Sequence, residues 1–229
     1  IANNKSAFII AEVAQAHDGS LGAAHAYIDL AARAGADAIK FQTHIAEEES
    51  TMDESFRINF SYKDKTRFEY WKRMEFSETE WYELAVHARD VGLVFMSTPF
   101  SIAAIELLEK TNIPVWKVGS GEVSFEPMIA AMIKTKKPII VSTGLSDMSV
   151  TDKLCISLKE NKIKFAILNC KTAYPSQLED VGLNMLEIYK QKYLCPVGLS
   201  DHTGTVNPAI AAIALGAAII EVHVVFDKD

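Results

Sequence analysis

The sequence is poor in cysteine, has no long apolar run and carries no excess of basic residues. Its three cysteines, Cys155, Cys170 and Cys195, are an odd number without a CxxC spacing, which suits a reducing compartment better than a disulfide framework. No apolar run reaches the roughly 20 residues that span a bilayer. The N-terminal stretch is too short and too acidic for a secretory signal. We therefore predict a cytoplasmic protein without a membrane partner.

Charge and composition narrow the partners further. Lys and Arg number 23 against 30 Asp and Glu, a net charge of −7, and no Lys/Arg-rich run forms the basic stripe that binds nucleic acid. Hydrophobic residues make up 49% of the chain, which excludes a disordered protein. No linker rich in Pro, Ser or Gly divides the sequence, so we predict one domain over residues 1–229.

Short strand-like runs alternate with helical patterns along the chain. The predicted strands are Phe8–Val13, Ala38–Thr43, Leu93–Ser97, Val115–Val118, Pro138–Ser142, Phe165–Cys170, Pro196–Ser200 and Ala218–Val224. The predicted helices are Gly22–Ala34, Glu78–Val91, Ile102–Lys110, Pro127–Lys134, Thr151–Glu160, Asn184–Lys192 and Asn207–Leu215. Eight parallel strands with right-handed crossovers close most naturally into an α/β TIM (β/α)8 barrel. A doubly wound open sheet is the alternative.

Two features of this pattern depart from a complete, regular barrel. The stretch from His44 to Phe76 is long and irregular, which indicates a lid or binding loop on the catalytic side after strand 2. The pattern also has eight strands but seven helices, and a barrel typically needs about 250 residues. We therefore expect a barrel that is truncated after strand 8. The flank without a helix should be apolar, making this chain poorly soluble or dependent on a partner.

Polar residues gather where the predicted strands end. Lys40 and Gln42 share the inward parity of strand 2, Glu12 shares a face with Ile10, and Lys117 precedes a Gly-Ser-Gly turn. A hydroxyl follows at five strand ends: Thr98, Ser120, Ser142, Thr172 and Ser200. Two lysines with several hydroxyls and flexible glycines favour an anion site. The alternative is that the lysines extend along the surface and the hydroxyls cap the following helices.

Two histidines end the last two predicted strands. His202 and His223 follow neighbouring strands, and two neutral imidazoles there can bind a divalent metal while leaving positions open for water and substrate. The alternative is a pair of structural histidines. His17, after strand 1, is expected to orient Glu12 or to contact substrate. The remaining histidines, His25, His44 and His87, are interpreted as structural.

Eight stretches together resemble one family, the sialic acid synthases, which use phosphoenolpyruvate to make nine-carbon 2-keto sugar acids. They are FIIAEVAQAHDGSL, AARAGADAIKFQT, VFMSTPFS, VWKVGSGE, PIIVSTGLS, CKTAYP, PVGLSDHT and ALGAAIIEVH. They cover nearly the whole chain in family order, so they are specific as a set. The resemblance implies the N-terminal catalytic TIM barrel of a homodimeric protein, with the last helix and a C-terminal antifreeze-like domain absent from this chain.

The resemblance also implies roles for individual residues. Phosphoenolpyruvate would be bound by Lys40, Gln42, Thr98, Lys117, Ser120, Ser142, Thr172 and Ser200. The catalytic residues would be Glu12, Glu122, Tyr174 and His223, with His202 and His223 holding a divalent metal, usually Mn²⁺, with Mg²⁺ or Co²⁺ as alternatives. The chain departs from the family pattern at Ala14, Ala16 and Thr172, where Gly, Asn and Asn or Ser are usual.

The implied reaction condenses phosphoenolpyruvate with an N-acetylated aminosugar such as N-acetylmannosamine. It gives a nine-carbon 2-keto sugar acid, sialic acid or an analogue, and releases phosphate. One alternative is a related synthase of seven-carbon or eight-carbon keto acids, against which the lack of a cysteine near strand 1 argues. The other is a noncatalytic barrel that binds phosphate and metal, which is motivated by the missing C-terminal sugar contacts and by the changes at Ala14 and Ala16.

Overall fold

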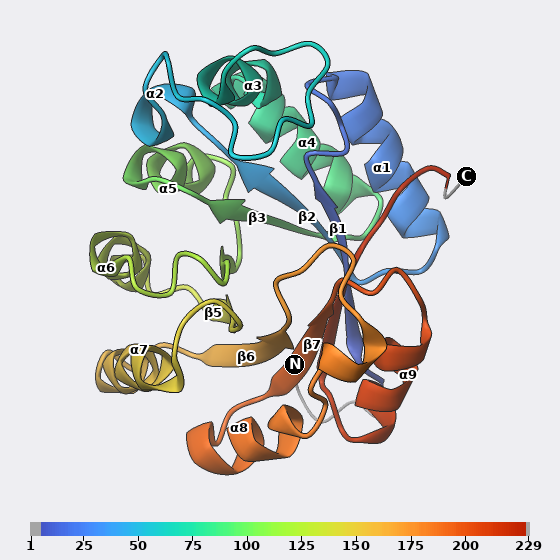
Figure 1. Ribbon diagram of the computed structural model, residues 1–229, viewed down its shortest axis with the longest axis vertical. Coiled ribbons are helices and arrows are strands. Elements are labelled where there is room, and N and C mark those ends of the chain that lie inside the picture. The colour runs from blue at the N-terminus through green and yellow to red at the C-terminus, as the bar shows by residue number, and fades with distance from the viewer. Residues whose placement is uncertain (1–5, 228–229) are drawn as a thin grey trace.

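The computed structural model describes residues 6–227 and shows a ring of parallel strands surrounded by helices (Figure 1). The strands are β1 (Phe8–Ala14), β2 (Ala38–Thr43), β3 (Val94–Pro99), β4 (Trp116–Val118), β5 (Ile139–Ser142), β6 (Phe165–Cys170), β7 (Val197–Asp201) and β8 (Ile219–His223). The helices are α1 (Leu21–Arg33), α2 (Ala46–Glu49), α3 (Arg67–Met74), α4 (Glu78–Asp90), α5 (Ile102–Glu109), α6 (Glu126–Lys134), α7 (Met148–Glu160), α8 (Met185–Tyr193) and α9 (Asn207–Ala214). A short 3₁₀ helix spans Leu178–Asp180.

The strand order confirms a TIM (β/α)8 barrel. The hydrogen-bonded order is β3-β2-β1-β8-β7-β6-β5-β4, every ladder is parallel, and β3 and β4 contact each other where the ring closes. Consecutive strands are joined by helices on the outside of the ring (Figure 1). The doubly wound alternative is wrong, because β3 and β4, which end the hydrogen-bonded order, contact each other and close the sheet into a ring, whereas an open sheet leaves its two edge strands apart.

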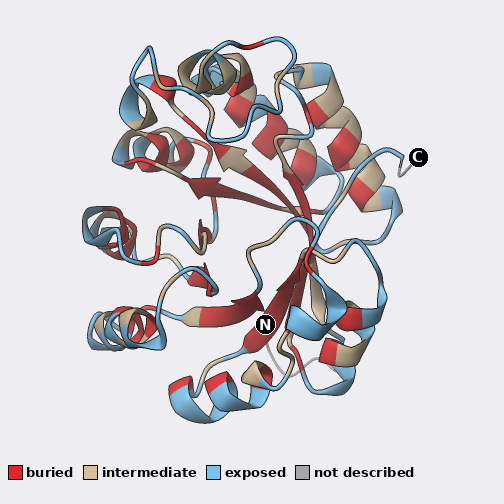
Figure 2. Cartoon of the chain, in the orientation of Figure 1, coloured by how far each residue is buried: buried red, intermediate tan, exposed pale blue. Residues whose placement is uncertain are grey.

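The interior of the barrel is divided into an apolar layer and a polar layer. Toward the strand N-termini, a small cluster of buried apolar side chains fills the barrel: Ile10, Ala38, Met96, Ile140, Ala166, Leu168 and Ile219. The outward-facing strand residues, such as Ile39 and Phe41, pack against the helices in a second and larger core. Buried residues accordingly occupy the strands and the helix faces turned toward them (Figure 2). Because successive strand side chains alternate, the next inward positions all lie one layer higher, toward the strand C-termini. Those positions hold the polar residues of the site.

The segment from 44 to 76 is more ordered than its sequence indicated. It lies on the C-terminal side of the barrel, as predicted, but it contains the helices α2 and α3 instead of being irregular throughout. Helix α3 begins at a Thr66 cap whose hydroxyl accepts from the Glu69 amide. These helices are four and eight residues long and rich in charged residues, so they offer too few turns for an apolar period to stand out in the sequence.

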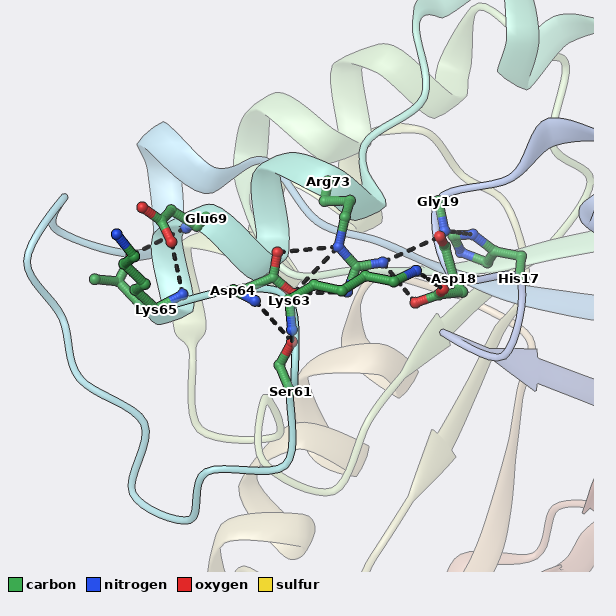
Figure 3. A network of polar contacts seen from close by, with 10 residues as sticks. His17, Asp18, Gly19, Ser61, Lys63, Asp64, Lys65, Glu69 and Arg73 are labelled. Carbon is green, nitrogen blue, oxygen red and sulfur yellow. Dashed lines mark hydrogen bonds and ion pairs between the residues drawn. The ribbon is translucent and has the colours of Figure 1, made fainter.

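Arg73 fastens this segment to the turn between β1 and α1 (Figure 3). Its guanidinium donates to both carboxylate oxygens of Asp64, at 3.0 Å from Nε and 2.6 Å from Nη2, and to the Asp18 carbonyl at 3.1 Å. Lys63 also donates to Asp18, at 2.8 Å. Gly19, at φ +75°, allows close approach, because a Cβ there would lie 2.2 Å from the Arg73 carbonyl oxygen. The long segment and the first strand turn therefore form one unit.

The flank beside β8 is apolar, as expected. A groove of about 520 Å³ runs along Ile220 and Val222 of β8 and is bordered by Ile210 and Ile213 of α9, which are 63% and 41% exposed. Whether this groove limits solubility stays a prediction. Within residues 6–227, no helix has the length and apolarity that a membrane crossing requires.

Candidate active site

A polar cavity of about 220 Å³ opens at the C-terminal ends of the strands, where barrel enzymes carry their active sites. All but one of the sequence-predicted site residues line it: Glu12, Lys40, Gln42, Thr98, Lys117, Ser120, Glu122, Ser142, Tyr174, Ser200, His202 and His223. The exception is Thr172, whose hydroxyl lies 2.9 Å from that of Ser120. The structure thus brings together residues from eight strands and strand ends.

Two lysines and two glutamates form the floor of this cavity. Lys40 Nζ lies 2.6 Å from Glu12 Oε2 and 3.8 Å from Glu221 Oε2, and Lys117 Nζ lies 3.3 Å from Glu221 Oε1. The side chains of all four are at most 5% exposed. An unpaired buried charge is costly, so alternating lysines and glutamates is what allows two ammonium groups to lie this deep. The interpretation of Lys40 and Lys117 as surface-reaching side chains is therefore wrong.

Burial and pairing shift the titration of these groups in opposite directions. Burial raises the pKa of Glu12 to about 7, more than its lysine neighbours lower it. Burial also acts to raise the pKa of Glu221, but Lys117 and Lys40 outweigh it and lower that pKa to about 2. Burial lowers the pKa of Lys117. Glu221 is therefore ionised, whereas the pKa of Glu12 is close to neutral pH. Glu12 can thus take up a proton when an anion binds to the cavity floor.

Hydroxyl groups line the walls above each lysine. Lys40 donates to Thr98 at 3.1 Å, and Lys117 donates to Ser142 at 2.8 Å. Ser200 donates to Glu221 at 2.9 Å. The helix-capping alternative is wrong for these hydroxyls, because α5, α6, α7, α8 and α9 have other N-cap residues: Ser101, Phe125, Asp147, Asn184 and Val206. Their positions favour recognition of a ligand over stabilisation of helices.

Two histidines and a tyrosine form the mouth of the cavity. The rings of His202 and His223 are 5.2 Å apart, and the Tyr174 ring stacks on His202 at 4.1 Å. His202 Nδ1 lies 2.9 Å from the Lys171 carbonyl, which only accepts, so Nδ1 carries the proton. Nε2 of His202 is left as a lone pair that accepts from the Tyr174 hydroxyl at 3.1 Å. Nε2 thus faces the mouth as a potential metal ligand.

The donor chemistry of this mouth fits a divalent metal with open positions. Desolvation lowers the pKa of His202, and desolvation together with His202 and Lys40 lowers that of His223 to about 4, so both rings are neutral at physiological pH. The backbone carbonyl on Nδ1 of His202 is the kind of partner that orients metal-bound histidines. Among residues 6–227, no group of three or more His, Cys, Asp or Glu side chains is arranged to hold a metal.

Two further predicted residues flank the reacting space. Gln42 donates from Nε2 to Glu12 Oε1 at 3.3 Å, placing its amide between the floor and the long segment. Glu122 is partly buried, and desolvation raises the pKa of its carboxyl. A Cβ at Gly119 would lie 2.3 Å from Glu122 Oε2, so the glycine in this turn makes room for the carboxylate.

The structure adds site residues that the sequence reasoning missed. Glu221 and Cys170 both line the cavity. The sequence alone indicates that both point inward, because Glu221 shares a strand face with His223 in β8 and Cys170 is the last inward-facing residue of β6. Phe100 and Leu145 also line it, from loops after β3 and β5, and no sequence periodicity marks such loop positions.

His17 does not take the role expected of it. It is 1% exposed, packs on Phe76 with ring centroids 4.8 Å apart, and is not among the residues that line the described cavity. Its Nδ1 accepts from the Gly19 amide at 3.1 Å. His17 therefore supports the turn between β1 and α1 instead of contacting Glu12 or a ligand.

The departure at Ala14 has a backbone consequence. Ala14 adopts φ +50°, in the left-handed region, where the β1–β2 register shifts between Glu12 and Ala14. A side chain in this region is strained by about 1 kcal/mol relative to glycine. Glycine adopts this region without that strain, and this chain makes the turn with Ala. Ala16, the second departure, is exposed.

A larger groove at the opposite end of the barrel lacks comparable chemistry. It measures about 650 Å³ and is lined mainly by apolar residues such as Phe8, Ile140 and Phe165. Only Lys159 and Lys164 supply charge there. The smaller cavity, where buried charges of both signs and two histidines converge, is the better candidate for catalysis.

Comparison with known proteins assigns this cavity to a family. A sequence model of the NeuB family matches residues 27–229. The chain belongs to the NeuB family. It is similar to the pseudaminic acid synthase of Campylobacter jejuni strain 81-176, with 36% identity over 98% of this chain and 67% of that protein. It is also similar to human N-acetylneuraminate-9-phosphate synthase, with 33% identity over 96% of this chain and 62% of that protein.

A solved structure agrees with this NeuB assignment. N-acetylneuraminic acid synthetase from Leptospira borgpetersenii, crystallised with citrate, matches at a TM-score of 0.85 and 28% identity, covering 99% of this chain and 78% of that one. The resemblance to sialic acid synthases is therefore confirmed. The chain spans about two thirds of the length of the curated relatives it matches, and the matching portion is their barrel fold.

Proposed function

We propose that this NeuB-family protein condenses phosphoenolpyruvate with an N-acetylated aminosugar to give a nine-carbon 2-keto sugar acid and phosphate. The observation that carries the proposal is the cavity floor, where Lys40 and Lys117 lie buried side by side with hydroxyls on each. Such a floor suits a small, highly charged anion. The names of its relatives, which are synthases of pseudaminic and N-acetylneuraminic acids, support the reaction class.

In this proposal the lysines and hydroxyls bind phosphoenolpyruvate. Lys40 and Lys117 supply point charges to phosphate and carboxylate. Thr98 and Ser142, which accept from these lysines, and Ser200, which donates to Glu221 in the structure, would donate their hydroxyl protons to the anion. Ser120, backed by Thr172, extends the same wall. Binding energy spent on the anion holds its C3 carbon toward the open mouth, where an acceptor sugar enters.

The bond changes then balance as follows. C3 of phosphoenolpyruvate attacks the C1 aldehyde of the open-chain sugar, forming the C–C bond while the aldehyde oxygen takes a proton and becomes a hydroxyl. Positive charge develops at C2, near the carboxylates of Glu12 and Glu122. Water adds at C2 and gives up a proton, for which a carboxyl with a raised pKa, such as either glutamate, is suited as base. Cleavage of the C2–O bond releases phosphate and leaves the ketone.

His202 and His223 would hold the divalent metal, which we propose to be Mn²⁺, with Mg²⁺ or Co²⁺ as alternatives. When bound, a divalent metal polarises a carbonyl oxygen as a Lewis acid. The protein prepares for this by keeping both imidazoles neutral and by fixing the His202 tautomer through the Lys171 carbonyl. Tyr174 stacks on His202 and so limits access to the mouth.

We infer a cytoplasmic location and a homodimeric assembly. The three cysteines are unpaired, which supports a reducing compartment such as the cytoplasm. The resemblance to the sialic acid synthases supports a homodimer. We infer that the segment from 44 to 76 helps to select the acceptor sugar, because its His44 contacts Phe100 and Gln42, which line the cavity.

The test is phosphate release with defined substrates. The protein is incubated with phosphoenolpyruvate, Mn²⁺ and either N-acetylmannosamine or arabinose 5-phosphate. Release with the N-acetylated sugar alone supports the proposal, and release with arabinose 5-phosphate alone would move it to the related keto-acid synthases. No release with any N-acetylated aminosugar, despite phosphoenolpyruvate binding, would favour the noncatalytic barrel.

A variant pair tests the metal assignment. His223→Ala should abolish both turnover and Mn²⁺ binding measured by calorimetry. The control is His25→Ala, because His25 lies on α1 outside the cavity and hydrogen-bonds His87. Mn²⁺ affinity equal to that of the unmodified protein in His223→Ala would show the metal role to be wrong.

A further inference from the structure

His44 joins the site to the long segment through contacts that its sequence position did not indicate. It follows β2 directly, two residues after Gln42. Its ring is stacked between Trp71 of α3, at 3.7 Å and 13°, and Phe100, at 4.1 Å and 16°. Phe100 lines the active-site cavity. His44 therefore lies in an aromatic sandwich whose one wall belongs to the segment from 44 to 76 and whose other wall belongs to the site.

A carboxylate fixes the rotation of this ring within the sandwich. Nδ1 of His44 lies 2.7 Å from Glu49 Oε2, and the other oxygen of Glu49 accepts from the Ile45 amide at 2.9 Å. The His44 side chain is 4% exposed and that of Glu49 is 12% exposed. A carboxylate accepts and does not donate, so Nδ1 carries a proton. Stacking on two faces and a hydrogen bond in the plane leave the ring no freedom, and Nε2 points in one direction.

That direction is the Gln42 amide. Nε2 lies 3.5 Å from Gln42 Oε1, while the amide nitrogen of the same side chain donates to Glu12 at 3.3 Å. A side-chain amide presents an acceptor at one end and donors at the other. The group that His44 presents therefore decides which end of the amide turns to Glu12. Because Nδ1 already holds a proton for Glu49, donation from Nε2 to Gln42 Oε1 requires the ring to be an imidazolium paired with Glu49; in that state the amide carbonyl faces His44 and the N–H groups face the Glu12 carboxylate.

We propose that His44 is a positioning residue for the reaction: held by Glu49, Trp71 and Phe100, it orients the Gln42 amide, which in turn holds the Glu12 carboxylate beside Lys40. The inference rests on the proposed condensation, for which Glu12 is one of two carboxylates at the reacting carbons. It assigns His44 and Glu49 a part in catalysis although neither lines the cavity.

The network of Figure 3 explains how the sandwich is kept in place. Arg73 lies on the same helix as Trp71, two residues along, and its ion pairs with Asp64 and Asp18 fix α3 on the turn that follows β1. Helix α3 thus connects the turn after β1 to His44, the residue that orients the Glu12 carboxylate of β1. Movement of the long segment would displace Trp71, and with it the ring of His44.

The kinetic test is a double-mutant cycle. His44→Phe keeps the aromatic stack and removes both ring nitrogens, so kcat should fall about tenfold, the effect of losing one hydrogen bond to a catalytic network. KM for phosphoenolpyruvate should rise less than kcat falls, because His44 acts on Gln42 and not on Lys40 or Lys117, which supply the charge that binds the anion. In a Gln42→Ala background, His44→Phe should have no further effect on kcat, since the amide through which it acts is gone.

A matched control separates positioning from packing. Trp71→Phe alters the same sandwich but leaves both nitrogens of His44 in place, so kcat should remain within about twofold of the unmodified protein. Glu49→Gln removes the acceptor that fixes the ring and should resemble His44→Phe. Unchanged kcat in His44→Phe, or an equal loss of kcat with and without Gln42, would overturn the proposal.

A second readout does not depend on turnover. The chain has four glutamines, so ¹⁵N-glutamine labelling gives few side-chain amide signals, and the one that disappears in Gln42→Ala is that of Gln42. This signal should shift in His44→Phe and stay in place in Trp71→Phe. A signal that is unmoved in His44→Phe would overturn the positioning role. If no sugar supports turnover, the proposed function fails while this measurement still decides whether His44 orients Gln42.

Discussion

Acidification should destabilise the protein through His17, which is buried without the solvation that an imidazolium needs. Burial lowers the pKa of His17 to about 4 from 6.5, with smaller opposing and assisting effects of Asp18, His44 and Arg73. Nδ1 accepts from the Gly19 amide, so a proton at that atom would also place two donors face to face. Protonation therefore costs both solvation and a hydrogen bond.

The sign and size of the effect follow from linkage. A base whose folded-state pKa is depressed contributes stability that is complete above its unfolded pKa and is lost as the pH falls toward the folded pKa. The window here runs from about pH 6.5 down to about pH 4. At about 1.36 kcal/mol per pKa unit, the loss is roughly 2 kcal/mol at pH 5 and approaches roughly 3 kcal/mol near pH 4.

Urea unfolding at pH 7 and at pH 5 measures this contribution. His17→Asn removes the titrating ring while its side-chain oxygen can still accept from the Gly19 amide. The free energy of unfolding should therefore fall less between the two pH values in the variant than in the unmodified protein, by about 2 kcal/mol. Its absolute stability will drop at both pH values, because the ring contact with Phe76 is lost.

The control variant removes the contact between the His17 and Phe76 rings but keeps the histidine. Phe76→Leu loses the ring contact, but it should keep the pH dependence of the unmodified protein. An identical difference between pH 7 and pH 5 in His17→Asn and in the unmodified protein would refute the reasoning, since another group would then account for the acid sensitivity.

Two further predictions concern the barrel interior. Gly198→Ala should lower the melting temperature by several degrees, because its Cβ would lie 2.1 Å from the Ile219 carbonyl oxygen in the β7–β8 ladder. The control Gly22→Ala, whose Cβ would meet only Ser20 Oγ at 3.9 Å, should raise it slightly. Equal melting temperatures for the two variants would contradict this prediction. Glu221→Gln should lower the free energy of unfolding at pH 7 by about 3 kcal/mol, because Lys40 and Lys117 lose the carboxylate that they share. The control Glu187→Gln changes an exposed carboxylate and should alter this free energy little. A loss in Glu221→Gln no larger than that in Glu187→Gln would show the pairing to be unimportant.

The barrel itself could be predicted because its determinants are local. The strands over Ala38–Thr43 and Phe165–Cys170 have the predicted bounds, and the other strands and the predicted helices differ by one to three residues at their ends. Strand and helix periodicity is set by each segment's own sequence, and the parallel order follows from the helical connections. The helices α2 and α3 were missed because they are short and charged, and contacts such as Arg73 with Asp64 hold them in place.

Much of the site was also predictable, for the same reason. Alternation along a strand places Glu12, Lys40 and His223 on inward faces without knowledge of the fold, once each strand is recognised. Glu221 satisfied the same rule and was overlooked beside the more conspicuous His223. His17 met the rule of position but not of direction, because its orientation depends on the left-handed backbone at Ala14 and on packing against Phe76.

The sequence by itself determined the fold class, the inward parity of the polar residues and the family resemblance, since each depends on residue order alone. Only the tertiary structure decided which charges compensate one another, such as Lys117 with Glu221, and which tautomer His202 adopts against the Lys171 carbonyl. It also decided that His44 faces Gln42 from between two rings. Such contacts join residues from separate strands and loops, and their distances and angles exist only after the chain has closed into a barrel.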